Sequence, residues 1–155
     1  LALPSVPMPD WPILLCLPKS LQPKTQADEI DFFKRSTPLP APASYEASYI
    51  AFFELYAAAA EVDFAAFCRG IEHMQISVWK RAERSEYGEK LASINNCLLD
   101  AGARCVGMSS LGPMLFCLAD AGDITQLSQV AHMLDCNIRE VRPVNRGRVL
   151  RWLNA

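Results

Sequence analysis

Short, almost wholly apolar runs alternate along this chain with longer segments in which apolar residues recur every three or four positions. The short runs have the length of strands and are bounded by proline, glycine or polar residues, which is typical of buried strands. They lie at residues 11–18, 104–108, 114–119, 137–143 and 147–152. The pattern predicts a sheet whose strands are separated by helices.

Helical spacing marks the first half of the chain between these runs. A short amphipathic helix is predicted at residues 28–34, with Ile30 and Phe33 facing inward and Phe32 as a further candidate. Ser44 is a good N-cap for a long helix. That helix carries a run of alanines up to Ala60 and apolar aromatic residues at Tyr45, Tyr49, Phe52, Phe53 and Tyr56.

Asp63 is placed to cap a second long helix, whose single apolar stripe continues to Val78, and we expect these two helices to pair as a hairpin. A third helix at residues 89–101 is followed by Gly102, where a left-handed residue would end it. Asp123 and Gln126 have the spacing of a capping box for a helix at residues 124–134.

This order of elements predicts an α+β fold in a single domain, residues 1–155. Strands that alternate with helices in this way need a sheet covered by helices. The last part of the chain fits a ferredoxin-like arrangement with an antiparallel sheet.

Composition narrows the classes of function. The chain has 155 residues, 51% of them hydrophobic, and a domain of this size buries roughly 70% of its unfolded surface. The formal net charge is -2, with only a modest basic run at Lys80, Arg81 and Arg84, so no nucleic-acid partner is expected. No apolar run reaches the ~18 residues that span a bilayer, so we expect a soluble, cytoplasmic protein without a membrane partner.

Cysteine and histidine usage predicts no metal site. The six cysteines are widely spaced, without a CxxC pair, and are interpreted as reduced, buried small hydrophobes. His73 and His132 have no cysteine, histidine or carboxylate partners at the spacing of metal ligands.

Two turns carry candidate chemistry. The first is GMSSLGP, residues 107–113, between two apolar strands, where glycines allow close approach of a ligand and Ser109 and Ser110 offer donors to a phosphate or carboxylate. The second is VNRGR, residues 144–148, where Arg146 and Arg148 would grip an anion beside Asn145. The alternatives are a tight hairpin and an ordinary solvated turn. No self-contained catalytic motif occurs, so the catalytic residues are unknown and are expected outside this chain.

The segments GMSSLGPMLFCLAD and EVRPVNRGR, in this order of elements, resemble the C-terminal half of the GHMP kinase superfamily. The chain looks most like the β-ribofuranosylaminobenzene 5'-phosphate synthases, whose third motif reads approximately GQSSWGP. Three further segments add to the similarity: PDWPILLCLP, Glu29 with the phenylalanines that follow it, and DFAAFCRGI. The motif is matched by Gly107, Ser109, Ser110, Gly112 and Pro113, whereas Met108 and Leu111 depart from it. Leu111 stands where that motif has an aromatic residue, so the side chain that could stack on an arene substrate is missing at this position.

The resemblance implies a ferredoxin-like C-terminal domain whose N-terminal partner domain, of the type that holds the ATP loop, is absent from this chain. It implies a synthase that joins an aminobenzoate to phosphoribosyl pyrophosphate with loss of CO2 and pyrophosphate, in tetrahydromethanopterin biosynthesis. Mg2+ would serve the parent enzyme as the partner of pyrophosphate. The implied substrate-binding residues are Gly107, Ser109, Ser110, Gly112, Pro113, Asn145 and Arg146.

Two alternatives remain open. In the first alternative, the parent protein is a GHMP small-molecule kinase whose phosphate loop lies upstream of Leu1. Otherwise the chain is a stand-alone ferredoxin-like module that binds a ligand or forms a homodimer, with the aromatic helix at residues 45–56 as an interface.

Overall fold

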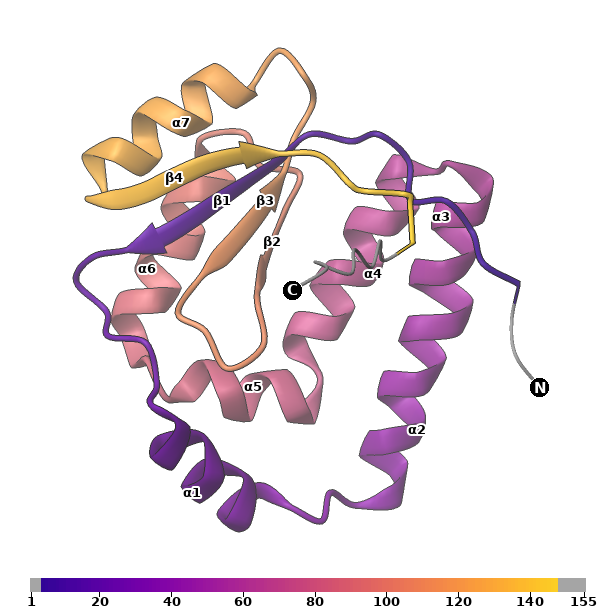
Figure 1. Ribbon diagram of the computed structural model, residues 1–155, viewed down its shortest axis with the longest axis vertical. Helices are drawn as coiled ribbons and strands as arrows, with labels where there is room; N and C mark the ends of the chain where they lie inside the picture. Colours follow the sequence, from indigo (N-terminus) through magenta and orange to yellow (C-terminus); the bar gives the residue numbers. More distant parts are fainter. Residues whose placement is uncertain (1–3, 148–155) are drawn as a thin grey trace, which may run out of the picture.

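The computed structural model describes residues 4–147, and its central feature is an antiparallel sheet of four strands in the order β2-β3-β1-β4 (Figure 1). The α+β fold and its antiparallel sheet are thereby confirmed. The strands are β1 (Ile13–Pro18), β2 (Cys105–Met108), β3 (Leu115–Leu118) and β4 (Cys136–Val141). The helical elements are α1 (Gln26–Ser36), α2 (Ala41–Tyr49), η1 (Ile50–Tyr56), α3 (Ala57–Glu61), α4 (Phe64–Ile76), α5 (Val78–Ser85), α6 (Gly88–Asp100) and α7 (Ile124–Met133).

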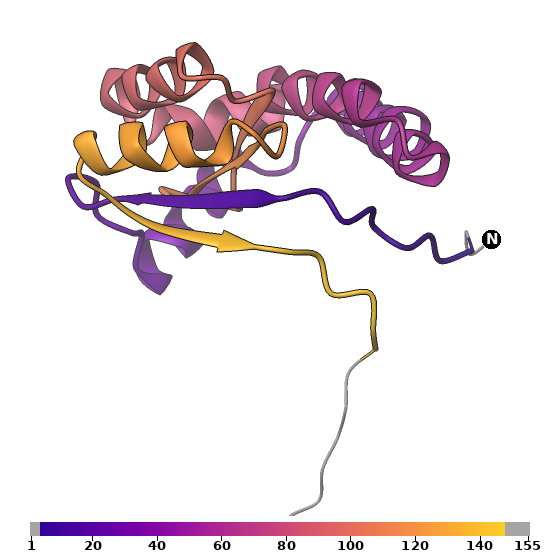
Figure 2. The ribbon, with the colours of Figure 1, turned by 90° about the horizontal axis from the view of Figure 1, so that it is seen from above.

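The main core lies between the sheet and the helices α6 and α7. Alternate residues of β1, namely Leu14 and Cys16, are buried, and they meet Leu91 and Leu98 of α6 and Leu127 of α7. Figure 2 shows α6 and α7 on the same side of β1 and β4. This period of two in the strands and of three to four in the helices is the pattern from which the layers were predicted.

A second cluster packs α4 against the β2 edge of the sheet. Cys68 and Ile71 of α4 are buried together with Cys105 and Leu118, which alternate in sequence with the main-core residues of their strands. Trp11 extends this cluster, with its ring centroid 5.2 Å from that of Phe64 and 5.1 Å from that of Phe67. Rings at such distances and tilts add to the stability that burial gives.

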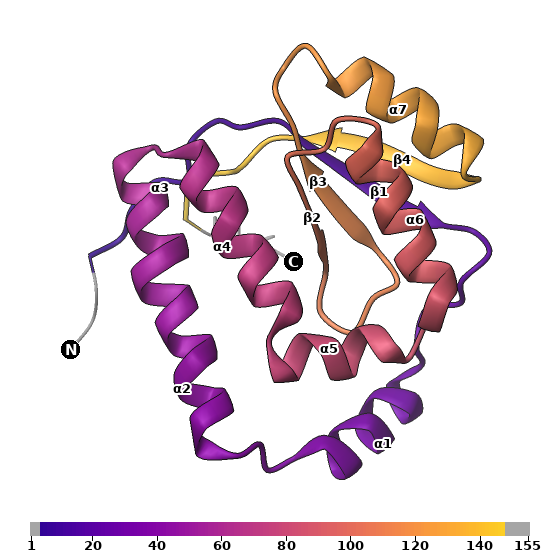
Figure 3. The same cartoon turned by 180° about the vertical axis from the view of Figure 1, so that it is seen from behind.

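The predicted hairpin of two long helices is confirmed (Figure 3). α2, η1 and α3 run as one continuous rod, since the backbone keeps helical torsions at both junctions. The rod begins at Ala41 after Pro40 and not at Ser44, because proline in the first turn has the backbone torsion that a helix start needs. Val62, with φ of 58°, ends it, and the Asp63 carboxylate accepts a hydrogen bond from the Ala66 amide at the start of α4.

Two further details of the helices differ from the prediction. In α1 it is Phe32 that is buried, at 2% exposed, while Ile30 and Phe33 are 47% and 40% exposed. Both phenylalanine rings contact Trp79, Phe32 edge-on and Phe33 stacked, but only Phe32 is enclosed, since the other residues of α1 are exposed or half-buried. The apolar stripe of α4 also ends earlier than predicted, because Ser77 interrupts it and caps the separate helix α5.

At the start of α7 the predicted capping box does not form. Asp123 has helical torsions, φ of -95° and ψ of -11°, and an N-cap side chain reaches the first amides only from extended torsions. The predicted strand at residues 147–152 lies outside the described residues apart from Gly147. No helix within residues 4–147 combines the length and the apolar character that a bilayer crossing requires.

The cysteines are mostly core residues, as predicted. Cys16, Cys68, Cys105, Cys117 and Cys136 are buried and Cys97 is half-buried, all as free thiols. Burial raises the pKa of the Cys136 thiol to about 11. A hydrogen bond with Cys16 together with burial raises the pKa of Cys117, which keeps it a neutral thiol.

Candidate functional site

The predicted loop, residues 109–113, connects β2 to β3 as a tight turn. The Ser109 amide donates to the Met114 carbonyl at 2.9 Å, and the Gly112 amide donates back to the Ser109 carbonyl at 2.8 Å. Two residues have positive φ, Ser110 at 42° and Gly112 at 71°. Two backbone hydrogen bonds therefore hold the loop in a defined turn.

The side chains of this loop divide between core and surface. The residue Leu111 is 2% exposed and Pro113 is also buried, so the side chains of both pack inward. Ser110 is exposed and Ser109 is half-buried, and neither hydroxyl has a hydrogen-bond partner among residues 4–147. At position 111 the side chain packs inward, so Leu111 does not offer a stacking surface to a ligand in this conformation.

Packing explains why both Gly107 and Gly112 are glycines, since neither position has room for a side chain. A Cβ on Gly107 would lie 2.2 Å from Cζ of Phe116, whose ring crosses β2 at this point. A Cβ on Gly112 would lie 2.6 Å from the Met108 sulfur, in addition to the strain of its positive φ. The hairpin alternative thus accounts for the two glycines and leaves the two serines without a structural role.

Side chains of α5, and Tyr87 shortly after it, hold the loop by hydrogen bonds to its backbone. The Lys80 ammonium donates to the Met108 carbonyl at 3.2 Å and to the Ser110 carbonyl at 2.9 Å, and it also pairs with the Glu83 carboxylate. The Tyr87 hydroxyl donates to the Leu111 carbonyl at 2.9 Å. Burial raises the pKa of Tyr87, so the hydroxyl stays protonated as a donor.

A further layer of polar residues fixes the end of β2. The Gln75 side-chain oxygen accepts from the Met108 amide at 3.0 Å and from the Arg84 guanidinium at 3.1 Å. Arg84 also donates to the Asn95 side chain at 2.9 Å. Burial lowers the pKa of Arg84, and the side-chain oxygens of Gln75 and Asn95 both accept hydrogen bonds from its guanidinium.

These supporting residues were not predicted. Lys80 and Arg84 belong to the basic run described above, and Gln75 lies within the apolar stripe that follows Asp63. The one available signal was the buried position of Gln75 within that stripe, since a polar residue there needs a partner.

The second predicted group, Asn145 and Arg146, lies elsewhere. The Asn145 side chain accepts from the Met8 amide at 2.8 Å and donates to the Met8 carbonyl at 2.7 Å, so it ties the two ends of the chain together. Arg146 is exposed and borders a shallow hollow of about 460 Å3 with Ser5 and Pro7. Arg148 lies outside the described residues.

The sheet register shows that the structure does not bring the two groups together. The loop follows Met108, which pairs with Leu115, at one end of the strands. The segment with Asn145 follows Val141, whose partner Ile13 also pairs with Leu118, at the opposite end. Figure 1 shows the loop and the departing C-terminal segment at opposite ends of the sheet.

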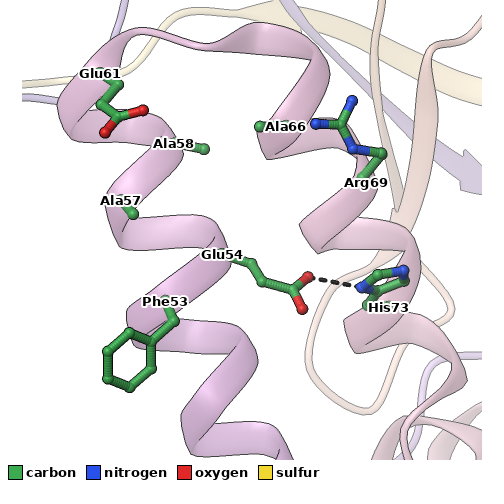
Figure 4. A pocket seen from close by; sticks show the side chains of 8 residues that line it. All are labelled: Phe53, Glu54, Ala57, Ala58, Glu61, Ala66, Arg69 and His73. Atoms are coloured by element: carbon green, nitrogen blue, oxygen red, sulfur yellow. Dashed lines mark hydrogen bonds and ion pairs between the residues drawn. The ribbon is translucent and has the colours of Figure 1, made fainter.

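A separate hollow of about 240 Å3 lies between the α3 end of the rod and α4 (Figure 4). His73 and Glu54 meet across it at 2.7 Å, between the histidine Nδ1 and a carboxylate oxygen. Arg69 and Glu61 border the same hollow from the two helices. A π-helical segment, η1, supplies Glu54, and such segments are common near functional sites.

Sequence comparison connects the chain with two curated proteins, while no family model matches it. Both are named β-ribofuranosylphenol 5'-phosphate synthase, one from Archaeoglobus fulgidus and one from Methanothermobacter thermautotrophicus. The first is 28% identical over 113 residues, 73% of this chain, and the second 28% over 111 residues, 72% of this chain. The aligned region is 34% of each relative, so the chain spans about a third of their length.

Solved structures share the fold. Homoserine kinase from Cytophaga hutchinsonii superposes with a TM-score of 0.67 over 90% of this chain and 44% of its own, at 17% sequence identity. Phosphomevalonate kinase from Streptococcus pneumoniae gives the same TM-score over 90% of this chain and 43% of its own, at 11% identity. The resemblance inferred from the sequence is confirmed: the chain has the fold of the GHMP kinase C-terminal domain, and its sequence is similar to that of β-ribofuranosylphenol 5'-phosphate synthases.

Proposed function

We propose that this chain is the substrate-binding domain of a synthase that joins a ribosyl phosphate unit to an arene. The similarity to the two synthases carries this proposal, because it covers nearly three quarters of the chain. The loop at residues 109–113 supports it, since it presents two hydroxyls that have no hydrogen-bond partner in the described part of the chain. Fold alone would not favour this function, because the solved neighbours are kinases.

The substrates we propose are phosphoribosyl pyrophosphate and a benzoate with an amino or hydroxyl group in the 4-position. The names of the relatives specify a phenol product, which makes 4-hydroxybenzoate as strong a candidate as 4-aminobenzoate. In the reaction a bond forms between the ribose C1' and the ring carbon that carries the carboxylate. The C1'–oxygen bond to pyrophosphate and the bond to the carboxylate break, so pyrophosphate and CO2 leave and the electrons balance.

The loop would bind the anionic substrate through groups that its own hydrogen bonds leave free. Among residues 4–147, no acceptor takes the amides of Ser110 and Leu111, which are consecutive and flank a residue with positive φ. Consecutive amides next to a left-handed residue form a concave donor site for anions. The hydroxyls of Ser109 and Ser110 add two donors to it.

Magnesium does not fit the described residues of this chain. No group of three histidine, cysteine, aspartate or glutamate side chains that could hold a metal occurs within residues 4–147. We therefore propose that Mg2+ comes to the site with pyrophosphate, since oxygen atoms are its preferred ligands.

The proposal is tested on the full-length protein. Pyrophosphate and CO2 release is measured from phosphoribosyl pyrophosphate with 4-aminobenzoate or 4-hydroxybenzoate, and ATP consumption on hydroxylated metabolites is measured in parallel. Release without ATP supports the synthase. Full activity after Ser109→Ala and Ser110→Ala together would refute the role of the loop.

Two other functions each have one observation in favour. The kinase folds of the solved neighbours favour a small-molecule kinase, which ATP turnover would reveal. The exposed aromatic residues on the rod favour a module that docks onto its own N-terminal domain or onto a second copy. These residues are Tyr45, Tyr49, Phe52 and Phe53, each more than half exposed. Self-association on a sizing column that Phe53→Ser abolishes would support the homodimer.

A further inference from the structure

Lys80 is the residue whose contacts extend furthest beyond the proposed function. Its side chain is only 13% exposed and that of its partner Glu83 only 4%. A buried ion pair is weak evidence for stability, because apolar residues of the same size often serve as well. The ammonium also donates to two backbone carbonyls of the loop, which an apolar side chain could not do.

The Ser110 carbonyl fixes the direction of the amide that follows it, and a second carbonyl, that of Ser109, does the same for the Ser110 amide. In a trans peptide the carbonyl and the following amide lie in one plane and point in opposite directions. Lys80 holds the Ser110 carbonyl, so the Leu111 amide of the same peptide unit faces away from Lys80. The Ser109 carbonyl is likewise held by the Gly112 amide, which turns the Ser110 amide outward.

The charge of Lys80 is paired within the protein. The Glu83 carboxylate pairs with it, and within residues 4–147 the hydrogen bonds of the ammonium are directed at Glu83, Met108 and Ser110. Lys80 acts on a ligand only through the loop.

We infer that Lys80, paired with Glu83, is a positioning residue that holds the Ser110–Leu111 peptide so that its amide binds a phosphate or pyrophosphate group. The inference rests on the proposed function for the identity of the anion. It adds a residue from α5, distant in sequence from the loop, as a determinant of affinity for the phosphorylated substrate and not for the arene.

The test compares wild-type full-length protein with the double variant Lys80→Met with Glu83→Gln, which removes the pair without leaving a buried charge unpaired. Lys80→Arg tests rescue, because a guanidinium can still donate to both carbonyls. Lys34→Met is the control, since Lys34 forms only an exposed pair with Asp31. Each protein is assayed for kcat, for KM of each substrate, for binding of pyrophosphate by calorimetry and for its thermal midpoint.

The double variant should raise KM for phosphoribosyl pyrophosphate and the Kd for pyrophosphate about tenfold, the effect of roughly one hydrogen bond to an anion. KM for the arene should stay within twofold, Lys80→Arg should restore most of the affinity, and Lys34→Met should match wild type. A folded double variant with unchanged pyrophosphate affinity overturns the inference. So does a wild-type protein that does not bind pyrophosphate.

The two proposals fail separately in this design. If the wild-type protein binds pyrophosphate in a Lys80-dependent manner but releases no CO2, the synthase assignment falls and the positioning role stands. If synthase activity is present but all affinities fall together with the thermal midpoint, Lys80 is merely structural and the inference is refuted.

Discussion

Replacing Gly112 by alanine should be the most destabilising exchange of glycine for alanine in the loop region. Alanine at φ of 71° costs about 1–2 kcal/mol, because its Cβ approaches the neighbouring carbonyl oxygen. The new Cβ would also lie 2.6 Å from the sulfur of Met108 and 2.8 Å from Cε2 of Tyr87. Met108 is 1% exposed and has little room to move, so this overpacking adds about 1–3 kcal/mol.

Alanine at three other glycines distinguishes the cost of a positive φ from the cost of a close Cβ contact. Gly88 has φ of 60° with nothing near its Cβ position, so Gly88→Ala should cost only the strain, about 1–2 kcal/mol. Gly107 has an ordinary φ but meets the Phe116 ring, so Gly107→Ala should cost only the contact, about 1–3 kcal/mol. Gly122 has neither feature, so Gly122→Ala should change the stability by less than about 0.5 kcal/mol.

The assay is urea and thermal unfolding followed by circular dichroism for all four variants. Each exchange reduces the entropy of the unfolded chain similarly, so differences among them report the native state. For a chain of 155 residues each kcal/mol lowers the midpoint by about 2–4 °C, so Gly112→Ala should melt roughly 4–20 °C below wild type. If Gly112→Ala is no less stable than Gly88→Ala, the loop does not pack against Met108 as described.

Three further measurements test other contacts. Hydrogen bonds from Arg35 and Lys24 hold the pKa of Glu86 below 4.5, so its pairing stabilises the protein above that pH and is lost as the pH falls through the lowered value. Glu86→Gln should therefore cost about 1 kcal/mol at pH 7 and nothing in strong acid, by urea titration at both pH values. Asp63→Ala should cost about 1 kcal/mol by loss of the α4 cap, while Asp63→Asn should retain most of it, in the same titration at pH 7. Since burial raises the pKa of Cys136 to about 11, its alkylation at pH 8, followed by mass spectrometry, should be slow in the folded protein and fast in urea.

The strands and most of the helices follow from local pattern, because burial on one face leaves a period of two or of three to four in the sequence. The helix α5 does not. Its eight residues, VWKRAERS, are mostly polar, and such a segment is expected on a solvated surface. Whether Lys80 and Glu83 are buried depends on Met108 and Ser110, about thirty residues further along the chain, which no local pattern includes.

The place of the candidate loop between two strands was predicted, but its detailed geometry was not. The glycines and serines of residues 107–113 correctly marked a turn between two strands. The inward packing of Leu111 could not be predicted, because a turn between apolar strands has no regular alternation to follow. The distance between this loop and Asn145 depends on the register of three strand pairs, in which a shift of one residue would change every facing neighbour.

The long helical rod shows most clearly what a periodic pattern leaves undecided. Its inner face is filled within this chain, since Ala58 is buried and Leu55 lies against Gly70 of α4. Its aromatic face, which includes Tyr49 stacked on Phe53, is covered by no element of residues 4–147. Helical spacing predicts that such residues share a face, but it does not state which molecule covers that face. The structure of residues 4–147 therefore assigns the inner face to contacts within this domain and leaves the aromatic face open to solvent.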